Sequence, residues 1–172
     1  MAGESVKVGE NRYRERFGRY YEDFEAGATY EHRPGRTISE ADNTWFALLT
    51  MNQHPIHFDA EYAKHSEFGK PLVVSTLTLS ILVGMSVSDT SQKAIANLGW
   101  EKITLPKPVF AGDTLYAEST VLDKRESNSR PDQGIVTIRT TGRNQHKEIV
   151  CEFERTMLVM RRGNTLEENA GY

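Results

Sequence analysis

Cysteine is almost absent from this sequence. Cys151 is the single cysteine among 172 residues, so no disulfide can form within the chain. A small secreted scaffold held together by disulfides is therefore excluded, and the chain fits a reducing compartment.

Long hydrophobic runs are also missing. The longest apolar stretch, 72–87, is interrupted by serine, threonine and glycine, and it is shorter than the roughly 20 apolar residues that cross a bilayer. We interpret it as a core segment and expect no membrane partner. Residues 1–16 contain acidic side chains and no apolar block, which indicates neither a signal peptide nor a transit peptide. The expectation is a soluble cytoplasmic protein.

The chain has no excess of positive charge. Its 24 acidic and 21 basic side chains give a net charge of −3, so it lacks the positive field that nucleic-acid binding needs. With 38% hydrophobic residues and no repeat or linker, it is long enough for one packed core. We expect one domain over 20–162. A flexible polar tail, 1–19, precedes it, because its charges alternate without helical periodicity, and a short tail, 163–172, follows it.

Helix caps and a proline divide the first half of the chain. Ser39 stands three residues before Asp42 and just ahead of an apolar-periodic segment, a spacing that predicts a capped helix start. Pro55 interrupts the helical period and predicts a shaped loop. Asp59 is then well placed to cap a short helix over 60–68.

A hydrophobic helix and several strands account for the rest. Within 72–87 the apolar side chains cover nearly the whole helical surface, which predicts a helix buried all round. Patterns typical of strands occur at 28–36, 114–122, 134–143 and 149–160. This layout predicts an α+β fold in which a curved antiparallel sheet wraps around a long hydrophobic helix.

Polar side chains are concentrated in the loop around Pro55, where Asn52, His54, His57 and Asp59 lie. Histidine titrates near neutral pH and is the commonest general base, and His57 is flanked by apolar residues. Asp59 is better explained as a helix cap. A metal site is disfavoured, because the two histidines are three residues apart across a proline and no second cluster of ligands follows.

Two further segments can shape a site. The start of the hydrophobic helix, 73–77, offers unpaired amides and a partial positive charge, which stabilise an oxyanion. Ser75 or Thr76 is also explained as the cap of this helix. Segment 106–113 contains two prolines and a Gly-Asp pair, which by themselves predict only a turn before a strand.

Together these segments resemble the MaoC-like (R)-specific enoyl-CoA hydratases and dehydratases. Residues 52–59, Asn-Gln-His-Pro-Ile-His-Phe-Asp, resemble that family's motif Asp-x-Asn-Pro-hydrophobic-His-x-Asp. Segments 71–76 and 108–113 follow at the family's spacing, so the resemblance covers about 20–161. It implies a hot-dog fold and a homodimer or higher homo-oligomer, in which two protomers build a tunnel for an acyl-CoA.

The resemblance also implies residue roles. In the family, the first acid of the motif and its histidine activate a water that adds to the β-carbon of a trans-2-enoyl thioester. A backbone amide at the start of the helix holds the thioester oxygen. The matching positions are Asn52, His57 and Thr76, with Ser75 beside it. Asn52 is neutral, so it can orient a water but cannot exchange its proton at pH 7, and the proton transfer passes to His57. No metal or redox cofactor is implied, and coenzyme A enters as part of the substrate.

Residues 49–52, Leu-Thr-Met-Asn, and 97–100, Asn-Leu-Gly-Trp, are similar to one subgroup of that family. The subgroup is associated with short, branched, dicarboxylic acyl-CoA substrates of the mesaconyl, itaconyl or methylmalyl kind. A second carboxylate calls for a cation, for which Arg33 and Arg36 are candidates, although exposed strand-end charges explain them equally well. We expect a hydro-lyase that hydrates an enoyl-CoA. The alternatives are a hot-dog acyl-CoA thioesterase and a non-catalytic acyl-CoA-binding subunit.

Overall fold

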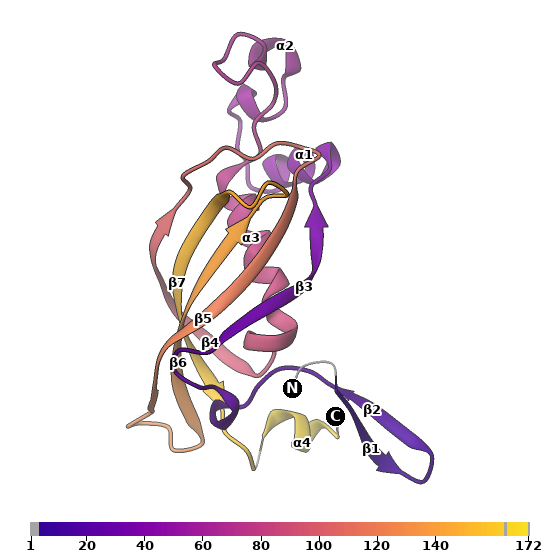
Figure 1. Cartoon of the computed structure of the whole chain (residues 1–172), viewed down its shortest axis with the longest axis vertical. Helices are drawn as coiled ribbons and strands as arrows, with labels where there is room; N and C mark the ends of the chain where they lie inside the picture. Colours follow the sequence, from indigo (N-terminus) through magenta and orange to yellow (C-terminus); the bar gives the residue numbers. More distant parts are fainter. Residues whose placement is uncertain (1–3, 164, 172) are drawn as a thin grey trace.

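One antiparallel sheet and one long helix form the body of the protein (Figure 1). The computed structural model describes residues 4–163 and 165–171. The sheet has the order β3-β5-β6-β7-β4, with antiparallel neighbours throughout. Its strands are β3 (Thr29–Thr37), β4 (Ala94–Thr104), β5 (Thr114–Glu126), β6 (Gln133–Arg143) and β7 (Ile149–Met160). Helix α3 (Ser75–Met85) lies along one face of the sheet, which is the expected α+β hot-dog arrangement.

The larger core lies between α3 and the sheet. Leu77 and Leu82 of α3 are buried in one cluster with Leu115 and Phe153 of the sheet. Gly142 on β6 permits this close approach, because a Cβ atom there would lie 2.3 Å from Cδ1 of Leu82. Protein interiors have no room for such an overlap, so the helix rests directly on the glycine.

One face of α3 remains exposed, which corrects the prediction of a helix buried all round. Thr76, Ser80 and Gly84 follow one another at intervals of four, and each is exposed. Residues four apart share one face of a helix, so these small side chains form a single exposed stripe. The larger apolar side chains of α3 face the sheet or lie beside it.

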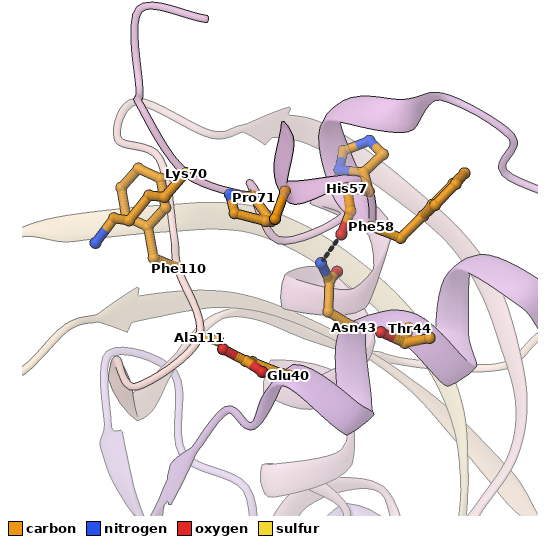
Figure 2. A pocket seen from close by; sticks show the side chains of 10 residues that line it. Glu40, Asn43, Thr44, His57, Phe58, Lys70, Pro71, Phe110 and Ala111 are labelled. Atoms are coloured by element: carbon orange, nitrogen blue, oxygen red, sulfur yellow. Dashed lines mark hydrogen bonds between the residues drawn. The ribbon is translucent and has the colours of Figure 1, made fainter. Parts of the chain in front are cut away.

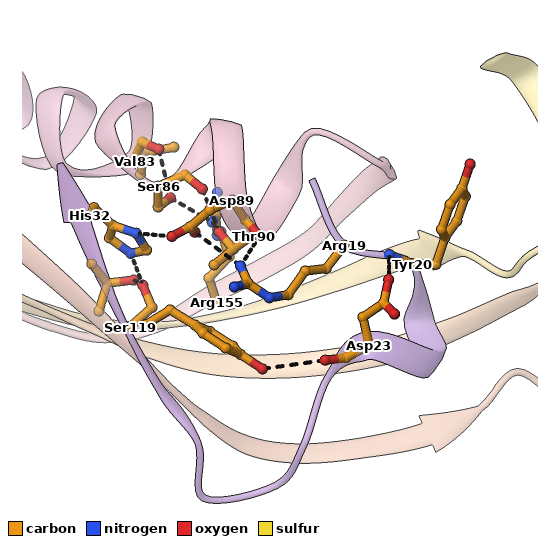
Figure 3. A network of polar contacts seen from close by, with 12 residues as sticks. Arg19, Tyr20, Asp23, His32, Val83, Ser86, Asp89, Thr90, Ser119 and Arg155 are labelled. Carbon is orange, nitrogen blue, oxygen red and sulfur yellow. Dashed lines mark hydrogen bonds and ion pairs between the residues drawn. The ribbon is translucent and has the colours of Figure 1, made fainter. Parts of the chain in front are cut away.

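Buried polar contacts hold the C-terminal end of α3 (Figure 3). His32 of β3 is 1% exposed, and its ring contacts Asp89 Oδ2 at 3.1 Å and Ser119 Oγ at 2.7 Å. Arg155 of β7 donates to Ser86 Oγ at 2.9 Å, and burial lowers the pKa of its guanidinium to about 10. The guanidinium is still charged at neutral pH, and it ties the residue after α3 to the sheet.

The predicted strands are confirmed at β3, β5, β6 and β7, whereas β4 is not predicted. Its pairing with β7 shifts register three times, and Lys102 within it has a φ of +51°. These irregularities remove the two-residue alternation that identifies a strand in a sequence.

Residues 4–16 form a hairpin, so the polar segment over 1–19, expected as a flexible tail, contains regular secondary structure. Strands β1 (Glu4–Gly9) and β2 (Arg12–Arg16) pair antiparallel, and Asn11 adopts a φ of +55° in the connecting turn. Alternating charges have no helical period, but they suit the two-residue period of a hairpin. Residues 1–3 lie outside the described residues.

Part of the expected C-terminal tail is also ordered. Helix α4 (Leu166–Ala170) carries Glu167, whose carboxylate forms an ion pair with the buried Lys93. This distant charge partner gives the segment a fixed place that local sequence does not reveal. Among the residues that the structure describes, no helix is long and apolar enough to cross a membrane.

Candidate functional site

A cavity of about 250 Å³ lies beside α1 (Glu40–Leu49) and the segment that leads into α3 (Figure 2). Its lining comes from α1, from Ala60 and Lys70, and from the three segments singled out in the sequence, 52–59, 71–76 and 106–113, of which 71–76 contributes only Pro71. The lining residues are Glu40, Asn43, Thr44, His57, Phe58, Ala60, Lys70, Pro71, Phe110 and Ala111. The fold therefore brings part of each candidate segment to one cavity, but Ser75 and Thr76 are not among its lining residues.

His57 is held in one orientation by a backbone carbonyl. It ends the 3₁₀ turn η2 (Pro55–His57), which Pro55 begins, and it is half-buried. Its Nδ1 lies 2.8 Å from the carbonyl oxygen of Leu72. A carbonyl oxygen only accepts, so Nδ1 carries the proton and donates it, and in the neutral ring Nε2 keeps a lone pair. The imidazole is thus fixed in the tautomer that acts as a base through Nε2.

The start of α3 presents two free amides. The residue before the helix is Val74, and no side chain caps it, so the alternative that Ser75 or Thr76 serves as the cap is wrong. The amides of Leu77 and Thr78 both donate to the Val74 carbonyl. The amides of Ser75 and Thr76 donate to no acceptor within the described parts of the chain. Such first-turn amides carry the positive end of the helix dipole and bind oxyanions.

Segment 106–113 packs against the residues before α3. The amide of Val73 donates to the carbonyl of Val109 at 2.9 Å. Asp113 Oδ2 accepts from the amide of Phe110, and Gly112 between them adopts a φ of +95°. The turn thus places Phe110 and Ala111 in the cavity wall. The sequence predicted the turn but not this contribution to the cavity.

Asp59 caps the next helix as expected, because its Oδ1 accepts from the amide of Tyr62 at 3.0 Å. The helix is shorter than predicted, since α2 covers only Ala60–Ala63 rather than 60–68. Ser66 Oγ donates to the carbonyl of Ala63, and such local side-chain bonds compete with a continuing helix.

Asn52 does not line the cavity. Its side-chain Oδ1 accepts from the backbone amide of His54 at 3.2 Å, and its backbone amide donates to the carbonyl of Ala47 at 2.9 Å. Both contacts shape the turn after α1, so the structure gives Asn52 a local role in the loop. Its function in holding a water stays a prediction.

Arg33 and Arg36 line a different cavity, which runs between β3 and α3. Both are exposed, and they form ion pairs with Glu31 at 3.0 Å and with Asp42 at 2.7 Å. Hydrogen bonds from Ser39, followed by the charge of Arg36, hold the pKa of Asp42 below its ordinary value. The structure does not bring Arg33 and Arg36 to the His57 cavity. The expected contact of these two arginines with a substrate carboxylate stays a prediction.

Several lining residues, among them Asn43 and Lys70, are missing from the sequence-based prediction. Lys70 lies at the cavity with its Nζ 4.1 Å from the centroid of the Phe110 ring. Asn43 and Ala47 form the buried face of α1. A polar residue on the apolar face of an amphipathic helix is the signal that could have identified Asn43.

The described residues contain no group of three or more side chains arranged to hold a metal ion. The rings of His54 and His57 are 5.8 Å apart between centroids, and each Nδ1 already has a hydrogen-bond partner. Cys151 is fully buried, and burial raises the pKa of its thiol to about 11. It is therefore a structural residue rather than a nucleophile.

Residues 7–171 match the family model described as mesaconyl-CoA hydratase. A mesaconyl-CoA hydratase of Cereibacter sphaeroides is 36% identical over 84% of this chain and 42% of its own length. A beta-methylmalyl-CoA dehydratase of Chloroflexus aurantiacus is 32% identical over 84% of this chain and 41% of its own length. The chain thus spans about two-fifths of the length of these curated relatives.

A solved MaoC-like dehydratase of Rhodospirillum rubrum superposes with a TM-score of 0.75 and 32% identity. The superposition covers 85% of this chain and 99% of that protein. The chain therefore matches nearly the whole of this solved structure, but only a part of each longer curated relative.

Proposed function

The chain belongs to the mesaconyl-CoA hydratase family, and on that premise we propose that it adds water reversibly to the double bond of a 2-enoyl-CoA. The observation that carries the proposal is the placement of His57 and the start of α3. The side chain of His57 donates to Leu72, which stands three residues before the free amide of Ser75. His57 and the amides that we assign to the oxyanion are therefore connected through the short segment 72–75.

The chemistry requires these two groups at opposite ends of the reacting unit. Nε2 of His57 takes a proton from water, and the oxygen bonds to the β-carbon of the enoyl thioester. The amides of Ser75 and Thr76 stabilise the negative charge that develops on the thioester oxygen. The imidazolium then returns a proton to the α-carbon, and dehydration follows the same steps in reverse. The proposed reaction uses no metal or redox cofactor.

We propose a short, branched, dicarboxylic acyl group of the mesaconyl, itaconyl or methylmalyl kind. The names of the relatives support this class. The cavity volume of about 250 Å³ suits a short acyl group, because pockets for larger ligands are usually about 300–1,000 Å³. Lys70 supplies a cation at the cavity, which would attract a second carboxylate.

A panel of enoyl-CoA thioesters tests this function. Straight, branched and dicarboxylic short-chain substrates are incubated with the protein, and hydration is followed by mass spectrometry and by loss of the enoyl-thioester absorbance. Preferred hydration of the branched dicarboxylic thioesters is expected. If no thioester in the panel gains water, the proposed activity is wrong.

The same incubations separate the alternatives. A hot-dog thioesterase would release free coenzyme A, which a thiol reagent detects. The neutral Asn52 favours a second candidate, a non-catalytic acyl-CoA-binding subunit, because it removes the acid of the family motif. That candidate requires a bound thioester that gains no water and releases no thiol.

Asn52→Asp is expected to retain or improve hydratase activity. The carboxylate keeps an oxygen that accepts from the amide of His54, so the loop should keep its shape. An aspartate also restores the acid that the family motif carries. The measurement is kcat/KM on the preferred substrate, and a complete loss of turnover would mean that the amide itself has a specific orienting role.

We also propose that two copies of the chain associate through β4. This strand lies at one edge of the sheet, and among the described strands it pairs only with β7. Its side chains Ile95, Leu98 and Trp100 are 40%, 53% and 41% exposed. Exposed apolar edge strands are usually covered, because they otherwise aggregate.

Trp100→Asp is therefore expected to convert a dimer into a monomer in sedimentation velocity. Tyr13→Asp is the matched control, since Tyr13 is also an aromatic strand residue and is 66% exposed, but it lies on β2 rather than on the edge of the five-stranded sheet. The control should leave the dimer intact. A wild-type protein that sediments as a monomer, or a Trp100→Asp variant that stays dimeric, would contradict association through β4.

A further inference from the structure

Asn43 connects three parts of the candidate site. It lies on α1, and its side chain is 4% exposed. Its Nδ2 donates to the carbonyl of His57 at 2.7 Å, a contact shown in Figure 2, and to the carbonyl of Leu72 at 3.1 Å. Its Oδ1 accepts from the amide of Val74 at 2.9 Å. The amide group thus uses both of its donors and an acceptor on three different backbone groups.

These contacts fix the base relative to the helix start. The Leu72 carbonyl that accepts from Asn43 also accepts from Nδ1 of His57. The amide of Leu72 donates to the carbonyl of Ile56, so the two segments are joined at several points. Val74 directly precedes Ser75, the first residue of α3 with a free amide. One side chain therefore holds the backbone of His57 and the backbone that leads to Ser75.

We propose that Asn43 is a positioning residue, which sets the His57 imidazole at its working place relative to the oxyanion-binding start of α3. The inference rests on the proposed function. Asn43 lines the cavity, but its donors are occupied by backbone carbonyls, so it acts through His57 and α3 rather than on the substrate. No other common side chain of this size offers two N–H donors and one carbonyl acceptor from the same planar group.

If His57 or the start of α3 is displaced, turnover should fall by a larger factor than the affinity for the substrate. A misplacement of about 1 Å between reacting groups can cost about 10²-fold in rate, because proton transfer and oxyanion stabilisation depend steeply on geometry. Binding of the coenzyme A portion does not depend on the orientation of the imidazole. The expected signature is a loss in kcat with little change in KM.

Asn43→Asp is the test variant. The carboxylate keeps an oxygen for the Val74 amide but turns acceptor atoms toward the carbonyls of His57 and Leu72. We expect kcat for the preferred enoyl-CoA to fall by about 30- to 100-fold, with KM within about threefold of wild type.

Asn144→Asp is the matched control. Asn144 is also buried, at 6% exposed, and it also makes three hydrogen bonds, in the turn between β6 and β7. It does not line the cavity. Its variant should keep kcat close to that of wild type, and an equal loss in both variants would indicate general destabilisation and overturn the proposal.

Two readouts separate positioning from a structural role. In the background of His57→Ala, Asn43→Asp should cost clearly less than it does in the wild type, because the part of its effect that passes through the imidazole is already lost. Nitrogen NMR of the His57 ring should show Nδ1 protonated in the wild type and loss of this fixed tautomer in Asn43→Asp. If Asn43→Asp does not fold, Asn43→Gln keeps the amide one methylene further from α1 and is put through the same assays.

Failure of the Asn43 proposal can be distinguished from failure of the proposed hydratase function. A wild-type protein that hydrates no thioester overturns the function, and the NMR measurement still decides the role of Asn43. The same ring signals in wild type and variant would overturn positioning, as would an undiminished effect of Asn43→Asp in the His57→Ala background.

Discussion

His57→Ala is expected to lower kcat/KM for enoyl-CoA hydration by about 10²- to 10⁴-fold, the usual contribution of a positioned general acid and base. The variant removes the lone pair on Nε2 that takes the proton from water. It also removes the group that returns a proton to the α-carbon. Initial rates on the preferred enoyl-CoA, followed by loss of the enoyl-thioester absorbance, measure the effect.

His65→Ala is the control for this variant. His65 is exposed on the loop that follows α2, outside the cavity. It should retain nearly full activity, and thermal melting of both variants shows whether the fold is preserved. Unchanged turnover in a folded His57→Ala variant would remove the central residue of the proposed mechanism.

Ser75→Pro is expected to lower kcat by about 10²- to 10³-fold, the usual cost of removing one oxyanion donor. Proline has no amide hydrogen, and the first position of a helix accepts it. Val74, the residue before it, has φ −59° and ψ 127°, which is the extended backbone that a following proline requires. The substitution should therefore remove a donor and leave α3 folded.

Ser75→Ala separates the amide from the side chain, because alanine keeps the backbone N–H. Its loss of activity should be far smaller than that of Ser75→Pro. In Thr76→Pro the preceding residue, Ser75, is helical rather than extended, so this variant tests the second free amide only where melting shows that α3 still folds. If both proline variants fold and turn over at the wild-type rate, the start of α3 does not stabilise the thioester oxygen.

Features with a local physical cause are predicted from the sequence. Asp42 and Ser39 form the predicted reciprocal cap of α1, because both partners lie within one helical turn. Strand β7 has the predicted bounds, because it is rich in β-branched and apolar residues and the turn segment 143–147 precedes it. Strand β4 is missed because its bulges depend on pairing with β7 rather than on its own sequence.

The sequence by itself determined the caps of α1 and α2, the proline-shaped loop and the three segments of the site, because short-range sterics and hydrogen bonds specify them. It also singled out His57. Only the tertiary structure decided that Asn43 joins His57 to the start of α3, and that Arg33 and Arg36 lie at another cavity. The reason is physical: these relations depend on how α1 and β3 pack against α3, and such contacts between distant segments have no signature in a local stretch of residues.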